Sequence, residues 1–388
     1  MNASACTQRR VVLRGPHEHR VGFVETSNKL RRCVVQFRCL SLRLCEVYWM
    51  STSAAVRRQP LPADRWAAVT LRCLRCAGSM GTPIQVTDLA SDRRECVRCS
   101  SAIQAIDGIW RAVLPARARQ LAPSLTAYEV VREKEGRWSE DAEFYLSLPW
   151  RDSTGRFTEQ WRIRSKSFDF VRKHVLPEFI QRLGQQRLSV LDLGAGNCWL
   201  SYRLASAGHL PVAVDIGISR KDGLGAAVHY ASSLGRLFPR FQAEMDCLPF
   251  ADGQFDLAIY NASFHYAQDY EATILEALRV LRPQGAILII DSPTYRVESD
   301  GEAMKREKAA AFASRFGTDA GGMRGQEYLT PERLVSLERA GIRWRRFSPW
   351  YGWRWATRPL AARLAGRRRP SRFHIYLGTR VSSISEAE

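Results

Sequence analysis

The chain has 388 residues, of which 45% are hydrophobic and 25% are charged. At roughly 100–200 residues per domain, this length predicts two or three globular domains, and the composition excludes a mainly disordered or fibrous protein. No uninterrupted apolar run approaches the ~20 residues of a membrane-spanning helix, so we expect no transmembrane segment.

The net charge of +19 comes from 58 Lys and Arg residues against 39 Asp and Glu residues. The excess lies at the two ends, because residues 188–291 carry 7 basic and 11 acidic residues while residues 292–388 carry 19 and 10. Arginine supplies 51 of the 58 basic residues, a bias typical of GC-rich coding. The charge therefore allows RNA as a partner but is weak evidence for it.

Residues 1–65 are expected to be an N-terminal extension that is either disordered or mis-annotated. They show no sustained helical or strand period, and Ser51–Ser53 and Pro60–Pro62 predict a flexible lead-in to the next segment. One hypothesis is that translation starts at Met50. No signal-peptide pattern precedes that residue, so we expect a cytoplasmic protein in a reducing compartment.

Two Cys-x-x-Cys pairs follow in residues 66–118. Cys73 and Cys76 form the first pair, Cys96 and Cys99 form the second, and 19 residues separate the two pairs. Two such turns can aim four thiolates at one point, which predicts a tetrahedral, closed and therefore structural Zn²⁺ site. The alternatives are two local disulfides, which a reducing compartment disfavours, or a module that has lost its metal.

The segment after the second pair resembles the tail of small zinc-ribbon proteins. Residues 103–115 contain Asp107-Gly108-Ile109 and end at Leu114-Pro115, with Trp110 where that tail has proline. Such ribbons occur as activator subunits or fused N-terminal modules of RNA, tRNA and protein methyltransferases. The resemblance implies a zinc-ribbon module at residues 66–118.

Residues 119–185 are predicted to form a helical cap or linker, with apolar residues at helical spacing over 161–179. The residues that could belong to a cap over an acceptor are Tyr128, Arg132, Glu135, Trp138 and Tyr145.

From residue 186 apolar strands alternate with helical stretches, which predicts a parallel α/β sheet. Strand 188–192 runs into the turn Gly194-Ala195-Gly196, and a second strand ends at Asp215, 21 residues after Gly194. At that spacing a carboxylate can accept hydrogen bonds from both hydroxyls of an adenosyl ribose. A dinucleotide-binding protein is the competing interpretation, but its third glycine is replaced by Trp199. Asp192 would suit the ammonium group of a methionine moiety and would oppose a pyrophosphate.

These residues resemble motif I of class I S-adenosylmethionine-dependent methyltransferases, and the loop at His265-Tyr266 is similar to the ubiquinone-biosynthesis-like branch, the methyltransferase type 11 pattern. The resemblance implies an α/β, Rossmann-like seven-stranded sheet over residues 186–388, with the last strand antiparallel. It implies S-adenosylmethionine as methyl donor and an adenine contact at Asp246. The expected cofactor-binding residues are Asp192, Leu193, Gly194, Ala195, Gly196, Asp215, Ile216, Asp246, Cys247 and Asn261.

A sulfonium is already a good leaving group, so methyl transfer depends mainly on holding the acceptor in line with the S–CH₃ bond. A base is needed only if the acceptor must lose a proton, and His265 is the candidate for that role. The alternative is that His265 only shapes the pocket together with Phe264 and Tyr266. Cys198 and Cys247 are expected to line the pocket rather than to act as nucleophiles.

The acceptor is expected to be an unidentified small molecule. Two alternatives stay open: an RNA methyltransferase whose ribbon binds the nucleic acid, and a non-catalytic scaffold that binds the cofactor. Between the last two strands, Trp350, Trp353 and Trp355 alternate with arginines up to Arg369. That segment could stack on RNA bases, make peripheral contact with a membrane, or simply cap the fold.

Overall fold

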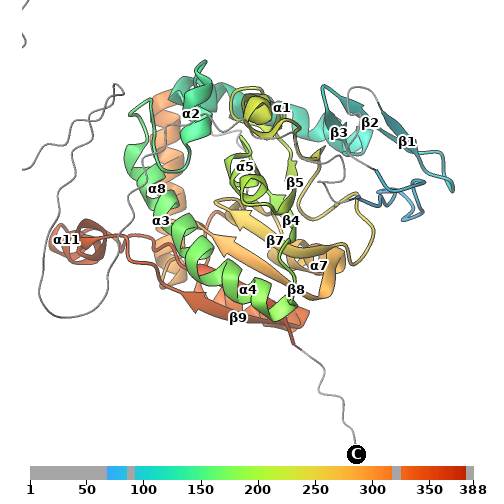
Figure 1. Cartoon of the computed structure of the whole chain (residues 1–388). Coiled ribbons are helices and arrows are strands. Elements are labelled where there is room, and N and C mark those ends of the chain that lie inside the picture. Colours follow the sequence, from blue (N-terminus) through green and yellow to red (C-terminus); the bar gives the residue numbers. More distant parts are fainter. Residues whose placement is uncertain (1–67, 85–91, 317–324, 382–388) are drawn as a thin grey trace, which may run out of the picture. The chain divides into compact units, whose positions relative to one another are not determined.

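The computed structural model describes residues 68–84, 92–316 and 325–381 (Figure 1). The chain divides into two units, residues 1–57 and 58–388, and all described residues belong to the second unit. The predicted N-terminal extension lies outside the described residues. The domain boundaries expected at residues 65, 118 and 185 stay predictions.

The segment with the four cysteines forms a small antiparallel meander. Its strands are β1 (Arg93–Glu95), β2 (Ala102–Ile106) and β3 (Ile109–Arg111). Asp107 and Gly108 join β2 to β3 with φ values of 52° and 69°. A two-residue hairpin loop with positive φ at both positions matches the twist of the strands, which explains the Asp-Gly pair at this point.

In the sequence, a helical region lies between this meander and the strands of the main sheet. It contains α1 (Pro115–Glu135), α2 (Ala142–Ser147), α3 (Thr158–Phe170) and α4 (Leu176–Leu183), with a π-helical turn at Val171–Val175 between α3 and α4. Helix α1 ends at Gly136, whose left-handed φ of 70° lets its N–H bond back to the last turn.

The main sheet follows in alternation with helices. Its strands are β4 (Ser189–Leu193), β5 (Leu210–Asp215), β6 (Arg240–Gln242), β7 (Phe255–Asn261), β8 (Leu281–Ile290), β9 (Ile342–Phe347) and β10 (Ile375–Arg380). The accompanying helices are α5 (Trp199–Ser206), α6 (Ala231–Leu234), α7 (Tyr270–Val280), α8 (Glu298–Phe316), α9 (Pro331–Ser336), α10 (Trp353–Ala356) and α11 (Arg358–Leu364), and short 3₁₀ turns cover Leu224–Tyr230, Phe264–Tyr266 and Leu337–Ala340.

These seven strands lie in the order β6-β5-β4-β7-β8-β10-β9, and β10 runs antiparallel to both of its neighbours. The predicted seven-stranded Rossmann-like sheet with an antiparallel last strand is therefore confirmed. All five residues of β4 are buried, because helices cover both faces of the sheet centre. Strands β4, β5 and β7 all deliver their carboxyl ends to one edge of the sheet.

The cysteine-bearing meander adds three further strands to the same sheet. Strand β3 pairs in parallel with β6, so that one ten-stranded sheet runs from β1 to β9. Trp110 lies at this seam, is fully buried and stacks on Phe241 with the ring centroids 6.2 Å apart. The tryptophan that departs from the ribbon tail pattern therefore packs the seam between the two parts.

A second set of contacts joins the first cysteine pair to the main sheet. The Arg72 N–H donates to the Pro249 carbonyl at 3.0 Å, and the Ala251 N–H donates to the Thr70 carbonyl at 3.0 Å. Leu71, which is 2% exposed, forms a β-bridge with Phe250 between these bonds. The strand leading to Cys73 is thus fixed to the loop between β6 and β7. Within the residues that the structure describes, none of the helices combines the length and the apolar character needed to cross a membrane.

Candidate active site and metal centre

A cavity of about 750 Å³ opens at the carboxyl ends of β4, β5 and β7. Its floor is formed by the loops after these strands, and its cover by α1 and α3. Ligands bind at this edge of open α/β sheets because the strand-to-helix loops converge there. Seven of the expected cofactor residues line the cavity: Gly194, Ala195, Gly196, Asp215, Ile216, Asp246 and Asn261.

The glycine-rich turn after β4 is shaped by a close approach to the loop after β7. Gly194 has a φ of +72°, and a Cβ at this position would lie 2.3 Å from the Ser263 Cβ. The Ser263 hydroxyl in turn donates to the Leu193 carbonyl at 2.5 Å. Only glycine fits this position, because both the backbone conformation and the neighbouring side chain exclude a larger residue.

Asp215 fixes the loop after β5 against the glycine-rich turn. Its Oδ2 accepts from the Gly196 N–H at 2.8 Å, and its Oδ1 accepts from the Gly217 N–H at 2.7 Å. Each oxygen keeps a lone pair for a further donor, which is what binding to two ribose hydroxyls requires. Burial raises the pKa of this carboxyl, while the two amides act in the opposite direction.

The turn after β6, where an adenine contact is expected, forms another part of the cavity wall. Asp246 is exposed and lines the cavity, whereas Cys247 does not. The Cys247 N–H donates to the Glu244 carbonyl at 3.2 Å, so this amide already has a partner within the turn. Contact of an adenine with Cys247 stays a prediction.

Asp192 lies below the cavity rather than on its wall. It is 1% exposed, and its Oδ2 accepts from the Ser201 N–H at 3.1 Å and from the Ser201 hydroxyl at 2.7 Å. Burial raises the pKa of this carboxyl to about 7. The carboxylate thus caps the first turn of α5, and its contact with a methionine ammonium stays a prediction. Leu193 is likewise fully buried and does not line the cavity.

The loop after β7 supplies the wall opposite the glycine-rich turn. Asn261 and Tyr266 line the cavity, but His265 does not. The His265 Nδ1 lies 3.4 Å from the Ser292 hydroxyl, and burial, followed by the charges of Lys308 and Arg164, lowers its pKa to about 3. Such a histidine is neutral at pH 7 but a weak base, so a role in proton transfer stays a prediction.

Neither motif cysteine lines the cavity, contrary to expectation. Cys198 is fully buried, and burial raises the pKa of its thiol well above the usual range. It begins α5 with a left-handed φ of 63°, a conformation that favours glycine. Cys247 is half-buried in the turn after β6.

The cover of the cavity contains charges that are largely paired. Of the residues predicted for a cap, Tyr128, Arg132 and Trp138 line the cavity, and Glu135 and Tyr145 do not. Arg132 forms an ion pair with Asp222, which follows β5 and which no sequence pattern had indicated.

Arg164 on α3 also lines the cavity, but no carboxylate among the described residues lies within ion-pair distance of it. Its guanidinium lies 4.8 Å from the centroid of the Trp161 ring, and burial lowers its pKa. It is therefore a cation that an anionic group of a ligand could reach.

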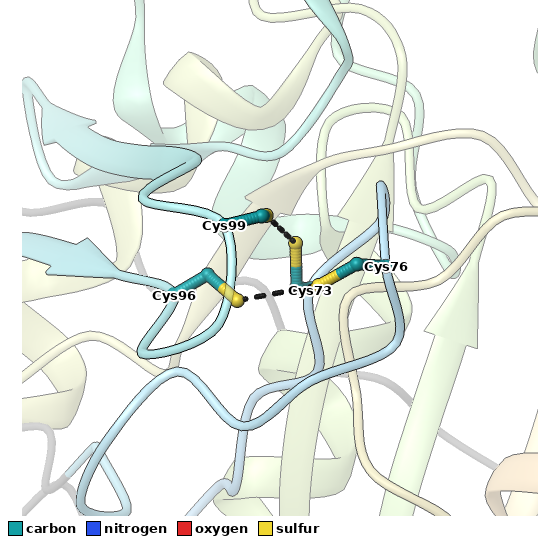
Figure 2. A group of neighbouring side chains, drawn as sticks. All are labelled: Cys73, Cys76, Cys96 and Cys99. Carbon is teal, nitrogen blue, oxygen red and sulfur yellow. Dashed lines mark hydrogen bonds between the residues drawn. The ribbon is translucent and has the colours of Figure 1, made fainter.

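The four cysteines converge on one point, as predicted (Figure 2). Their sulfur atoms all lie within 4.8 Å of one another, with Cys73 and Cys99 3.6 Å apart and Cys76 and Cys96 3.4 Å apart. Tetrahedral coordination with Zn–S bonds of ~2.3 Å places the sulfurs ~3.8 Å apart, so the cluster fits Zn²⁺.

Backbone amides around the cluster favour thiolates. The Arg75 N–H points at the Cys73 Sγ and the Arg98 N–H at the Cys96 Sγ, each at 3.4 Å. The Ser101 N–H lowers the pKa of the Cys99 thiol to about 6. The pKa of the Cys76 thiol is instead raised to about 12: the Gly78 amide lowers it, but the neighbouring thiols and burial outweigh that effect. Thiolates bind Zn²⁺, and a set of four leaves no position for a water molecule, so the site is suited to a structural metal.

Comparison with known proteins agrees with this geometry. Residues 191–289 match the family model described as "Methyltransferase domain". Malonyl-[acyl-carrier protein] O-methyltransferase of Geobacter sulfurreducens is 29% identical over 45% of this chain and 63% of its own length. Demethylmenaquinone methyltransferase of Mycolicibacterium gilvum is 29% identical over 33% of this chain and 59% of its own length. The chain thus spans about three fifths of the length of these relatives.

Among solved structures, a 1,6-didemethyltoxoflavin-N1-methyltransferase of Burkholderia thailandensis is 16% identical, with a TM-score of 0.40 over 74% of this chain and 98% of that one. The family match and the observed sheet order identify the central part of this chain as a class I S-adenosylmethionine-dependent methyltransferase domain.

The buried carboxyl of Asp192 predicts a pH-dependent stability. Its pKa of about 7 in the folded state exceeds the usual value of 3.8, so the folded protein holds this proton more tightly than the unfolded chain does. The stability that protonation contributes is present at low pH and is lost as the pH rises toward 7. Asp192→Asn keeps the acceptor for Ser201 and removes the titration. The wild type should lose this stability between about pH 5 and pH 8, and the variant should not. The unfolding free energy of the variant minus that of the wild type should therefore increase by about 2–4 kcal/mol over this range.

Urea unfolding of both proteins at the two pH values checks this expectation. The matched control is Asp300→Asn in the first turn of α8. If the difference in unfolding free energy between Asp192→Asn and the wild type does not change with pH, Asp192 is ionised in the folded protein throughout this range.

The cysteine cluster predicts one zinc ion per chain. Elemental analysis of the purified protein should give about one zinc, and Cys96→Ser should reduce this content because one of four thiolates is removed. Cys198→Ser is the matched control, since that thiol lies outside the cluster. A folded wild-type protein without metal would rule out the zinc site.

Proposed function

We propose that this chain is an S-adenosylmethionine-dependent methyltransferase that acts on a small organic acceptor. The main support is the geometry of Asp215 at the cavity wall. Its carboxylate accepts hydrogen bonds from the Gly196 and Gly217 amides, and each of its oxygens keeps one lone pair for a ribose hydroxyl. The match of residues 191–289 to the methyltransferase family supports it.

The cofactor would lie along the loops after β4, β5 and β6. Gly194–Gly196 would face the methionine moiety, Asp215 the ribose, and Asp246 the exocyclic amine of the adenine. When bound, S-adenosylmethionine supplies an electrophilic methyl group on a sulfonium. The acid groups of this wall complement the positive charge of that compound, in agreement with the excess of acidic residues over 188–291.

The acceptor would enter on the side of the cavity walled by α3 and α5. Trp161 and Trp199 pack edge to face there with ring centroids 6.0 Å apart, and Phe157 lies on the same wall. Rigid aromatic walls hold a flat or apolar molecule in a fixed orientation, and orientation is the main requirement of methyl transfer from a sulfonium. Asn261 and Tyr266 supply polar groups on the opposite wall.

A small acceptor is favoured because α1 and α3 cover the cavity. The names of the relatives specify acceptors as different as malonyl-[acyl-carrier protein] and demethylmenaquinone, and they support small-molecule chemistry without fixing the acceptor of this chain.

Replacement of Asp215 tests the cofactor site. Asp215→Ala should weaken S-adenosylhomocysteine at least about 100-fold in calorimetric titrations, because two charge-assisted hydrogen bonds to the ribose are lost. Glu271→Gln, in the first turn of α7 and away from the cavity, is the matched control and should bind as the wild type does. Unchanged affinity in a folded Asp215→Ala protein would refute the ribose assignment.

Labelling tests the acceptor class. The protein is incubated with S-adenosylmethionine carrying a labelled methyl group and with fractionated lysate, and Asp215→Ala serves as the inactive control. We expect label in the small-molecule or organic fraction. Label in RNA or in the amino-acid side chains of protein would refute the small-molecule acceptor while leaving methyl transfer intact, and binding of cofactor without any labelling would indicate a scaffold.

A further inference from the structure

The connection between β9 and β10 carries an unusual concentration of one charge. Residues 341–381 contain eleven arginines, no lysine, no aspartate and no glutamate. Two of these arginines pair with carboxylates of other elements, Arg345 with Glu178 and Arg368 with Glu307. Among the described residues no carboxylate lies within ion-pair distance of Arg354, Arg363 or Arg367, and all three are exposed. The segment therefore presents uncompensated positive charge to the solvent.

The same segment exposes large apolar side chains. Trp350 is 58% exposed and Trp353 is 78% exposed, and Leu360 and Leu364 are 59% and 80% exposed. Leu360 and Leu364 are four residues apart on α11 and so share one face of that helix. Helices α10 and α11 bury none of their residues, and Figure 1 shows α11 standing away from the sheet.

The base of this projection is firmly attached to the cover of the cavity. Tyr351 is 3% exposed, its carbonyl accepts from Arg162 on α3 at 2.8 Å, and its hydroxyl lies 2.8 Å from the Ser167 hydroxyl. Trp355 stacks on Phe373 at 5.4 Å and carries the Arg358 guanidinium 3.8 Å from its ring centroid. The exposed side chains are thus presented from a packed base joined to α3, the helix that also supplies Trp161 and Arg164 to the cavity wall.

We propose that α10 and α11 form a peripheral docking surface for an anionic lipid bilayer. Exposed arginines can pair with lipid phosphates, tryptophans are suited to the headgroup region, and the leucines can enter the acyl boundary. Lipid rather than nucleic acid is indicated by Leu360 and Leu364. These exposed leucines can enter the acyl region of a bilayer, whereas the phosphates and bases of a nucleic acid offer them no apolar partner. In addition, the ring of Trp355 is already occupied by Phe373 and Arg358, and Trp350 and Trp353 pack edge to face at 5.1 Å. This surface does not depend on the proposed methyl transfer.

Co-sedimentation of the full chain with vesicles tests the proposal. The wild-type protein should bind vesicles of phosphatidylcholine mixed with phosphatidylglycerol, should bind pure phosphatidylcholine vesicles much more weakly, and should be released by salt. The double variant Leu360→Ser/Leu364→Ser should bind the mixed vesicles at least about 10-fold more weakly, because its apolar face is lost. Arg363→Gln/Arg367→Gln should bind less and depend less on salt.

A matched control removes exposed apolar side chains elsewhere. Leu275→Ser/Val335→Ser changes residues that are 49% and 63% exposed on other helices, and it should bind as the wild type does. Since all the substituted residues are exposed, the variants should keep the wild-type melting temperature. Failure of the wild type to bind either vesicle type would overturn the proposal. So would binding of transfer RNA with no binding of vesicles, or a dimer that is lost in the Leu360→Ser/Leu364→Ser variant.

Discussion

The contact on which the candidate site depends is the pair of hydrogen bonds that Asp215 accepts from Gly196 and Gly217. One carboxylate at the end of β5 thereby holds two separate loops, the turn after β4 and its own continuation, at a fixed spacing. The two backbone N–H groups satisfy part of the hydrogen-bonding capacity of this buried carboxylate, and each of its oxygens keeps a lone pair that can accept from a ligand. The left-handed turn at Gly194, packed against Ser263, completes this edge of the sheet.

The cysteine-bearing meander is part of the same construction. Its strand β3 extends the main sheet at β6, and the segment before Cys73 is hydrogen-bonded to the loop between β6 and β7. Arg117, at the start of α1, reaches Glu244 on the cavity wall with its Nε 2.9 Å from Oε1. A metal bound by the four thiolates would therefore hold a segment that supports one wall of the cavity, because sheet hydrogen bonds run without interruption from β1 to the main sheet.

Charge is distributed unevenly over this fold, and the distribution separates two surfaces. Within the cavity, acidic groups of the floor meet cations of the cover, as in the pair of Arg132 with Asp222. Along the connection between β9 and β10, arginines face the solvent without acidic neighbours in the sequence. The first arrangement suits a cationic cofactor, and the second suits an extended anionic surface.

The sequence by itself indicated the succession of strands along the chain, the glycine-rich turn, the carboxylate of Asp215 at a strand end and the four-cysteine cluster. Each of these depends on local spacing: a buried strand before a turn, or two residues between cysteines that must face one point. It could not determine which side chains of a motif face the cavity. Asp192 turns into the first turn of α5, Cys198 is buried, and His265 lies beside the wall, because neighbouring elements compete for each side chain. Nor could it reveal the pairing of β3 with β6 or of Arg132 with Asp222, since these are tertiary contacts between residues about 130 and 90 positions apart in the sequence.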